Sequence, residues 1–520
     1  MGDWNMLKEN DQFRVLIVAT NFIEKWDKLE LVCKENLAVN SLASYLMSKN
    51  YDVTAINAQL EDMNNNEVLD SIQNSRFDLI GVSCSPQKLY TSSKDFVIKA
   101  RKAYPSAFIV MGGIFPSSSY KEILKDLPEL DAVLLGEGEF SLENLCRHIQ
   151  IGNVNNLSDI PGIAYTMNDE LIVVPPKRIE DLDLLPFPLR DPRAFSQIDG
   201  IKAYMIAGRG CYGNCSFCSI QSAYNYKKRI CRSAKNVVDE IQLLIENYGV
   251  TFIQFHDDIF YDYSPQNQKW LHEFISLVRE RNLKFKFRIY LRPNDIRENE
   301  ICRLKSIGLD TVFIGAESGV QRILNEMNKR VSPEQIRNSV EILKRCGVSV
   351  SLGFITIVPT MSYDELKENY EFIYSIGECS DANLHNRLNI YYGCTYEKTL
   401  NNLGLLLERE HFWEIHSYKF LDKRVELYHD QLQVVKLYAK PTKKQENIIL
   451  RILNTKGDTT RASEIESINT DAWIKATKLL LDVVENHPLY EKLTNYEMKN
   501  IYEVFDNLSK HYSNILDEIS

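Results

Sequence analysis

The first 150 residues alternate short apolar runs with stretches in which apolar residues recur every three or four positions. Runs such as Phe13–Thr20 and Phe77–Ser83 predict buried strands, whereas residues 36–48 and 90–103 predict helices. Near-continuous apolar strands that alternate with helices are typical of a parallel sheet covered on both faces. We therefore expect an α/β, doubly wound (Rossmann-like) domain over residues 1–150.

Small and polar residues follow three of these predicted strands. Parallel sheets bind ligands at the carboxyl ends of their strands, and glycine pairs let a flat cofactor approach the backbone closely. The candidate cofactor-binding residues at these ends are Ser83, Cys84, Gly112, Gly113, Ser117, Gly136, Glu137 and Gly138. Tight turns between strands and helices would explain the same residues without any ligand.

Residues 151–195 predict a linker, in which a hairpin turning at Asn168-Asp169 precedes a stiff proline-rich connector. Over residues 196–410 the alternation of helix and strand returns. The predicted strands are 201–207, 251–256, 285–291, 310–315, 348–358 and 388–392. Six βα units predict a partial (β/α)6 TIM barrel, with its site at the carboxyl ends of the strands.

The last segment, residues 411–520, predicts helices over 445–455, 471–485 and 494–519. The final helix carries an apolar stripe of the kind that packs into a core. We expect a helical domain that covers the barrel mouth as a lid and sets substrate choice. A preceding aromatic group either lines a substrate cavity or packs as a connection; its members are His411, Trp413, His416 and Tyr418.

Three thiols lie within eight residues, directly after the first predicted barrel strand, at Cys211, Cys215 and Cys218. Three thiolates on one tight loop can hold three irons of a [4Fe–4S] cluster and leave the fourth iron open. A disulfide hub or a zinc site would be the alternative. Zinc needs a fourth ligand nearby, and no Cys or His follows until Cys231.

The spacing C-x3-C-x2-C, with Phe217 before its last Cys, resembles the signature of radical S-adenosylmethionine (SAM) enzymes. The resemblance implies that SAM binds the open iron through its amino and carboxylate groups. It also implies that an electron from the cluster splits SAM into methionine and a 5′-deoxyadenosyl radical.

Further barrel positions match this family in order and spacing. Phe255-His-Asp-Asp-x-Phe260 resembles the second-strand motif and Gly315-Ala-Glu-Ser-Gly319 the fourth. Asp257 and Asp258 would take the SAM amino group or cap the next element. A guanidinium at the end of the third strand, Arg292, would clamp the SAM carboxylate. The resemblance assigns Glu317 and Ser318 to the ribose or the methionine end of SAM.

The glycine-rich strand ends ahead of this loop, with the linker after them, resemble the cobalamin-binding domain of cobalamin-dependent radical SAM enzymes. Many cobalamin domains supply a lower axial histidine, but this sequence has no histidine before His148. The resemblance therefore implies cobalamin held without that ligand. A weaker lower ligand favours the reduced, nucleophilic cobalt that takes a methyl group from SAM.

The resemblance implies a methyltransferase that alkylates an unactivated carbon of a small-molecule or peptide natural-product intermediate, using the 5′-deoxyadenosyl radical and methylcobalamin. It also implies an external one-electron donor similar to flavodoxin or ferredoxin. One alternative is a cyclase or rearrangement enzyme with the same cofactors. Another is a methylthiotransferase, with a second cluster on Cys33, Cys84 and Cys146. A third is a non-catalytic iron–sulfur or zinc module.

Composition and charge restrict the partners and the cellular compartment that we expect. The net charge of −10 gives no electrostatic support for nucleic-acid binding. No apolar run approaches the roughly 20 residues of a membrane span, and the start lacks the apolar core of a signal peptide. Eleven cysteines, an odd number scattered along 520 residues, indicate no disulfide framework. We expect a cytoplasmic enzyme without a membrane or nucleic-acid partner.

Overall fold

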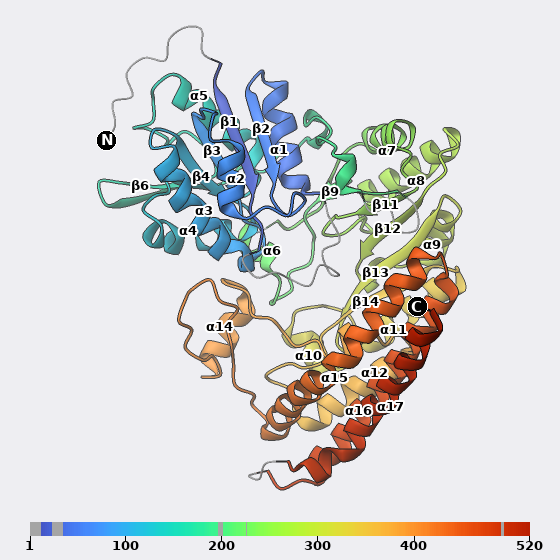
Figure 1. The fold of residues 1–520 in the computed structure, drawn as a ribbon. Coiled ribbons are helices and arrows are strands. Elements are labelled where there is room, and N and C mark those ends of the chain that lie inside the picture. The colour runs from blue at the N-terminus through green and yellow to red at the C-terminus, as the bar shows by residue number, and fades with distance from the viewer. Residues whose placement is uncertain (1–11, 23–34, 196–200, 225, 490–492, 520) are drawn as a thin grey trace.

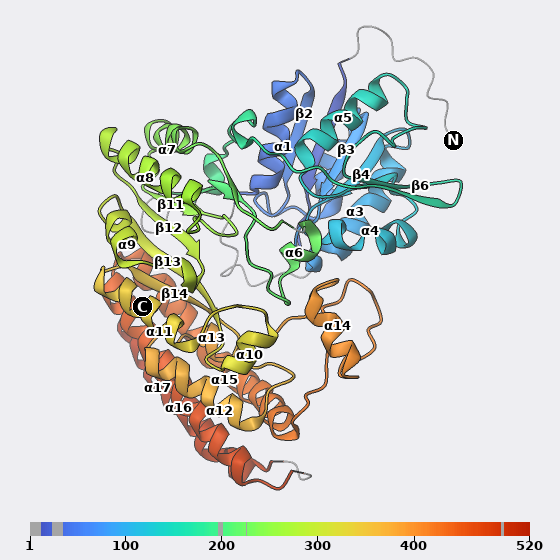
Figure 2. The ribbon, with the colours of Figure 1, turned by 180° about the vertical axis from the view of Figure 1, so that it is seen from behind.

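The computed structural model describes residues 12–22, 35–195, 201–224, 226–489 and 493–519. Figures 1 and 2 show an N-terminal α/β domain, in blue, and a helical bundle, in red, at opposite ends of the barrel core. Within the described ranges, no helix is long and apolar enough to cross a membrane.

The N-terminal domain is a seven-stranded sheet in the order β2-β1-β3-β4-β5-β6-β7. The strands are β1 (Arg14–Ala19), β2 (Asp52–Asn57), β3 (Leu79–Ser83), β4 (Phe108–Gly112), β5 (Ala132–Leu134), β6 (Ile163–Met167) and β7 (Glu170–Val174). The helices are α1 (Leu37–Ser48), α2 (Asn65–Ser71), α3 (Tyr90–Ala103), α4 (Ile114–Asp126) and α5 (Gly138–Gln150). The first five strands are parallel, which confirms the predicted doubly wound sheet.

The predicted linker hairpin forms β6 and β7, and it extends the sheet antiparallel to β5. Asn168 and Asp169 form its turn with φ of 50° and 65°. Both residues therefore adopt the left-handed conformation, which a two-residue hairpin turn requires and which Asn and Asp tolerate. The linker thus contributes two strands to the sheet of the N-terminal domain.

The core is a five-stranded sheet in the order β14-β13-β12-β11-β8, parallel throughout. Its strands are β8 (Lys202–Met205), β11 (Phe252–Phe255), β12 (Lys286–Leu291), β13 (Leu309–Glu317) and β14 (Ser349–Phe354), and a small hairpin pairs β9 (Gly208–Arg209) with β10 (Ile230–Cys231). The helices are α6 (Ser219–Tyr224), α7 (Ala234–Tyr248), α8 (Pro265–Glu280), α9 (Glu298–Lys305), α10 (Gln321–Glu326), α11 (Pro333–Arg345), α12 (Tyr363–Ile376), α13 (Asp381–Leu384) and α14 (Thr395–Asn402). Capping boxes at Ser332 and Ser362 open α11 and α12.

Residues 388–392, predicted as the sixth barrel strand, do not form a regular strand. Arg387, just before the segment, forms an isolated parallel bridge with Ile357 beyond the end of β14, and Ile390 forms an isolated antiparallel bridge with His416. The carbonyl of Asn386 accepts hydrogen bonds from the amides of both Thr356 and Ile357, at 2.9 and 3.1 Å. Because one carbonyl serves two successive amides, a regular ladder does not continue along this edge.

The C-terminal helices are α15 (Lys423–Thr455), α16 (Thr459–Asn486) and α17 (Asn495–Ile519). The first two are longer than predicted, and α17 matches its predicted range to within one residue. They pack on one another and on α12 and α13. The apolar stripe of α17, from Met498 to Ile519, lies in the core as predicted. Figure 1 shows the bundle along the side of the barrel, and its role as a lid stays a prediction.

One cysteine pair departs from the expectation of unpaired thiols. Cys302 of α9 and Cys346, which follows α11, form a disulfide with 5.4 Å between their Cα atoms. The two helices are neighbours on the outside of the barrel, although 44 residues separate the cysteines in the sequence. Tertiary packing of α9 on α11 creates this proximity, which cysteine spacing does not reveal.

A buried ion-pair network joins the N-terminal domain, the linker and the core. The Arg190 guanidinium donates to Glu35 at 2.9 Å and also to Glu240 of α7. Glu35 accepts a further hydrogen bond from the amide of Tyr204 in β8, at 3.0 Å. The side chains of all three ionised residues are at most 4% exposed. Their charges compensate one another, and Glu240 has a second cationic partner in Arg232.

We expect the substitution Arg190→Ala to destabilise the protein strongly, because it leaves the buried carboxylate of Glu35 without a counter-ion and leaves Glu240 with Arg232 alone. Removing one partner of a buried pair typically costs about 3–5 kcal/mol. The matched control is Arg193→Ala, whose ion pairs with Asp191 and Glu61 are exposed and worth about 0–1 kcal/mol. The measurement is the urea midpoint followed by circular dichroism, and equal midpoints for the two variants would contradict the expectation.

Candidate functional site

The three-cysteine loop begins where β8 and the short strand β9 end. The Cys211 Sγ accepts a hydrogen bond from the amide of Gly213 at 3.3 Å. The Cys215 Sγ lies 3.2 Å from Nη1 of Arg292, which projects from the end of β12. Two of the three sulfurs therefore already have a hydrogen-bond donor beside them, one from the backbone and one from a cationic side chain. The loop is thus prepared for negatively charged sulfur ligands.

The acidic pair after β11 supports the backbone of this loop. Asp257 accepts hydrogen bonds from the amide of Ala207 at 2.9 Å and from Arg229 at 3.3 Å. Asp258 accepts from the amide of Gly210 at 2.8 Å. Burial raises the pKa of Asp257 to about 6, although Arg229 opposes the shift. These contacts support the preceding loop and do not cap the next element, whereas the contact with the SAM amino group stays a prediction. Only Asp258 also lines the cavity described below.

The donor set fits a [4Fe–4S] cluster with one open iron. Burial raises the pKa of Cys218 to about 11, and it raises that of Cys211 as well. Metal binding to thiols displaces their protons, so an iron–sulfur cluster supplies the charge that this half-buried loop lacks. Phe217 packs against the apolar core of the barrel beside the last two cysteines.

The fourth-strand motif ends β13 in an unusual backbone conformation. Glu317 has φ of 69° and forms a buried ion pair with Lys329 at 2.7 Å. The Ser318 hydroxyl is fully buried and donates to Asn369 at 2.8 Å. Arg292 donates to the carbonyl of Lys329 as well as to Cys215. The motif, the third strand and the cluster loop therefore meet at one end of the barrel, as predicted.

A cavity of about 240 Å³ separates this end of the barrel from the N-terminal domain. Six of the eight predicted cofactor-binding residues line it: Ser83, Gly112, Gly113, Gly136, Glu137 and Gly138. Cys84 is fully buried beneath the surface. The Ser117 hydroxyl accepts from the amide of Gly136 at 3.0 Å and donates to the carbonyl of Gly113 at 2.7 Å. Cys84 and Ser117 therefore support the glycine loops without lining the cavity.

The glycines are required by the path of the backbone at this edge. Gly113 has φ of 124°, and a Cβ there would lie 2.8 Å from the carbonyl oxygen of Cys84. Gly136 has φ of 77°, and a Cβ there would lie 2.9 Å from Pro176. Apolar side chains, including Ile17, Val110 and Leu134, complete this wall. A smooth, largely apolar sheet edge of this kind fits a large flat cofactor such as cobalamin.

The core contributes residues that the sequence analysis did not assign to the site, namely Arg209, Tyr224, Tyr226 and His256. Arg209 pairs with Glu139 at 2.6 Å and with Glu137 at 3.5 Å. These ion pairs join the barrel side of the cavity to the side formed by the N-terminal domain. Burial favours the neutral form of Glu139, but the charge of Arg209 outweighs it and lowers the pKa. Two of them have a signal in the sequence, since Arg209 stands between two glycines just before the cysteine loop and His256 lies in the second-strand motif.

The absence of an axial histidine from the N-terminal wall agrees with the sequence. His148 lies on α5, where its ring contacts Asn144 and Asp159 outside the cavity. His256, which comes from the barrel, is the sole histidine among the described residues that line the cavity. Cobalamin on the glycine edge would thus have no histidine beneath it from its own domain.

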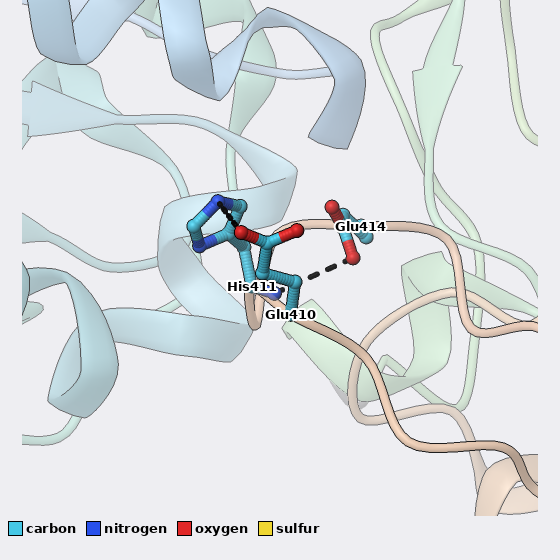
Figure 3. A group of neighbouring side chains, drawn as sticks. All are labelled: Glu410, His411 and Glu414. Atoms are coloured by element: carbon cyan, nitrogen blue, oxygen red, sulfur yellow. Dashed lines mark hydrogen bonds and ion pairs between the residues drawn. The ribbon is translucent and has the colours of Figure 1, made fainter.

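The aromatic group before α15 forms a connection to the N-terminal domain. Trp413 packs on Tyr90 of α3 with ring centroids 5.2 Å apart, and the side chain of Gln87 donates to the carbonyl of Glu414 at 2.8 Å. None of the four residues named from the sequence lines the cavity. Figure 3 shows Glu410, His411 and Glu414 close together on this loop, all of them exposed.

The methylthiotransferase arrangement is not supported by the described cysteines. Cys84 and Cys146 are both fully buried, and they belong to the apolar clusters on opposite faces of the N-terminal sheet. Cys33 lies outside the described residues. A sheet separates the two described thiols, so they cannot share one cluster.

Comparison with known proteins places both domains. The radical SAM superfamily profile matches residues 205–373, and the B12 binding domain profile matches residues 32–146. An uncharacterized methyltransferase of Pyrococcus horikoshii is 27% identical over 340 residues, which cover 65% of this chain and 72% of the relative. An anaerobic magnesium-protoporphyrin IX monomethyl ester cyclase of Rubrivivax gelatinosus is 30% identical over 340 residues, with 64% of this chain and 60% of the cyclase covered.

Solved structures agree in fold. The cobalamin-dependent SAM radical enzyme OxsB, with aqua-cobalamin and SAM bound, superimposes with a TM-score of 0.78 at 17% identity, over 98% of this chain and 80% of OxsB. The radical SAM methyltransferase TsrM from Kitasatospora setae gives a TM-score of 0.63 at 15% identity, over 76% of this chain and 79% of TsrM. With a B12 binding domain and a radical SAM domain in one chain, this protein belongs to the cobalamin-dependent radical SAM enzymes.

Proposed function

We propose that this protein is a methyltransferase that alkylates an unactivated carbon of a small-molecule or peptide intermediate. The observation that carries the proposal is one cavity lined from both cofactor regions, by Gly136 on the cobalamin side and by Gly210 on the cluster side. When bound, the cluster with SAM supplies a 5′-deoxyadenosyl radical and cobalamin supplies the methyl group. The electron comes from an external one-electron donor of the flavodoxin or ferredoxin kind.

The proposed roles of the residues follow from their contacts. Cys211, Cys215 and Cys218 hold the cluster, and Arg292 stabilises the negative charge on its sulfurs through the contact with Cys215. Asp258 faces the cavity and is the better placed of the two acidic residues to meet the SAM amino group. Glu317 and Ser318 order the strand end beside it.

The chain itself orients the two cofactor walls and excludes water. Arg209, ion-paired with Glu139, fixes the distance between the cluster loop and the glycine edge. Tyr224 and Tyr226 stack with ring centroids 5.2 Å apart at the cavity wall, and Arg178 lies 4.1 Å from the Tyr226 ring centroid. These rings close the cavity on the side of α6, which protects a radical from solvent.

The second candidate is a cyclase or rearrangement enzyme that uses the same cofactors without methyl transfer. The similarity to the Rubrivivax gelatinosus cyclase favours it. The uncharacterized methyltransferase and the methyltransferase structure favour the first candidate. The two differ in one step that does not require the substrate, namely transfer of a methyl group from SAM to cobalamin.

For methyl transfer, we expect ¹³C-methyl SAM to label the bound cobalamin and to release S-adenosylhomocysteine when the reconstituted enzyme is reduced anaerobically. The measurement is mass spectrometry of the extracted cobalamin and of the SAM products. A cyclase would release 5′-deoxyadenosine without label on cobalamin, and this result would reject the methyltransferase. Protein reconstituted without cobalamin is the control.

For the cluster, we expect Cys215→Ala to lose the roughly four irons per chain that one [4Fe–4S] cluster provides, together with SAM cleavage under dithionite. The matched control is Cys231→Ala, because that thiol lies on β10 and contacts Asn267 at 3.2 Å instead of belonging to the loop. Iron analysis and 5′-deoxyadenosine release are the measurements. Retention of SAM cleavage by the Cys215 variant would contradict the site.

For the cobalamin edge, we expect Gly136→Ala to reduce cobalamin retention, because its Cβ would press on Pro176 and displace the loop. Gly152→Ala is the control, since Gly152 also has positive φ, 72°, but a Cβ there meets nothing within 4 Å. The measurement is the cobalamin absorbance retained after desalting. Equal retention by both variants would remove the glycine edge from the cofactor site.

A further inference from the structure

The two faces of β12 differ sharply in chemistry. Phe287, Ile289 and Leu291 are buried in the apolar core that the outer helices cover. Arg288 and Tyr290 alternate with them and therefore point to the inner face of the barrel. Both inner residues are only half-buried. The barrel interior is thus partly open and polar at this level, unlike its outer face.

Arg288 lies across the inner face of the sheet. Its Nη2 donates to the Ser351 hydroxyl of β14 at 3.1 Å, across the intervening strand β13. The guanidinium lies 5.5 Å from the ring centroid of Tyr290 and 5.8 Å from that of Phe313. Its Nε atom is buried and has no hydrogen-bond partner. The side chain is therefore fixed in place while part of its hydrogen-bonding capacity is unused.

The charge of Arg288 also lacks a counter-ion. Within the described part of the chain, no ion pair involves Arg288, whereas Lys286 on the same strand pairs with Asp310 at 3.2 Å. A guanidinium stays protonated at physiological pH, and a half-buried charge is unfavourable unless something pairs with it. The barrel interior therefore presents a fixed cation to whatever enters it.

We propose that Arg288 binds an anionic group of the substrate, a phosphate or a carboxylate, on the inner face of the barrel. Because Nε is buried, such an oxyanion would accept from the outer nitrogens of the guanidinium, in the two-pronged geometry that arginine favours. Gln254 donates to the Tyr290 hydroxyl oxygen at 3.1 Å, which leaves the phenol proton for the same oxyanion. The inference rests on the proposed function, because it names the class of substrate.

The test measures binding of two probes, radiolabelled orthophosphate and radiolabelled acetate, by equilibrium dialysis with the full chain reconstituted with iron, sulfide and hydroxocobalamin. We expect saturable binding of at least one probe, weakened about tenfold or more in Arg288→Gln. Arg288→Lys keeps the positive charge but loses the planar guanidinium, so its affinity for the probe should lie between those of the wild type and Arg288→Gln. The stronger probe identifies phosphate or carboxylate as the substrate group.

Lys286→Gln is the matched control, because it removes one positive charge from the same strand at an exposed, already paired position. Equal loss in this variant, or equal binding by the wild type and Arg288→Gln, would overturn the proposal. So would loss of SAM binding in Arg288→Gln, which would assign the arginine to the SAM carboxylate. Iron content and circular dichroism verify that each variant is folded.

The outcome is separable from that of the proposed function. Anion binding is measured without reductant and without turnover, so a failed methyl-labelling experiment leaves the result for Arg288 intact. Conversely, labelled cobalamin together with Arg288-independent anion binding would support the methyltransferase and reject only the substrate class.

Discussion

The arrangement of this protein depends on a buried charge network centred on Arg190. The guanidinium comes from the linker, and the carboxylates it joins, Glu35 and Glu240, come from the N-terminal domain and the core. None of the three side chains reaches water to any useful extent. Together with the ion pairs of Arg209 across the cavity, the network therefore holds the sheet edge of the N-terminal domain opposite the barrel mouth.

Charge also organises the cavity itself. Arg209 connects the cluster loop to the acidic residues after β5, and Arg292 connects the third strand to Cys215. Arg288 lies on β12, four residues before Arg292, and has no partner of opposite charge among the described residues. Arginine thus recurs wherever this enzyme must hold loops or ligands with fixed geometry, in agreement with the rigid fork of its side chain.

Local sequence patterns predicted most elements well. In the N-terminal domain, the apolar runs located β1 and β3, and the helical spacing of apolar residues located α1 and α3. The cysteine loop was also identified, and six of the eight residues predicted for the cofactor site of the N-terminal domain line the cavity. The helices α2, α4 and α5 were not predicted individually, and the segment at 388–392 was predicted to be more regular than it is.

Sequence by itself determined the chemistry of the cluster loop and the two-domain order, because both depend on residue type and short-range spacing. Only the tertiary structure decided which side chains meet across long distances. Nothing in the spacing of Cys302 and Cys346 shows that they adjoin, and nothing local shows that Arg209 and His256 face the glycine edge. Those relations arise from how helices pack on a sheet and how one sheet is held against another.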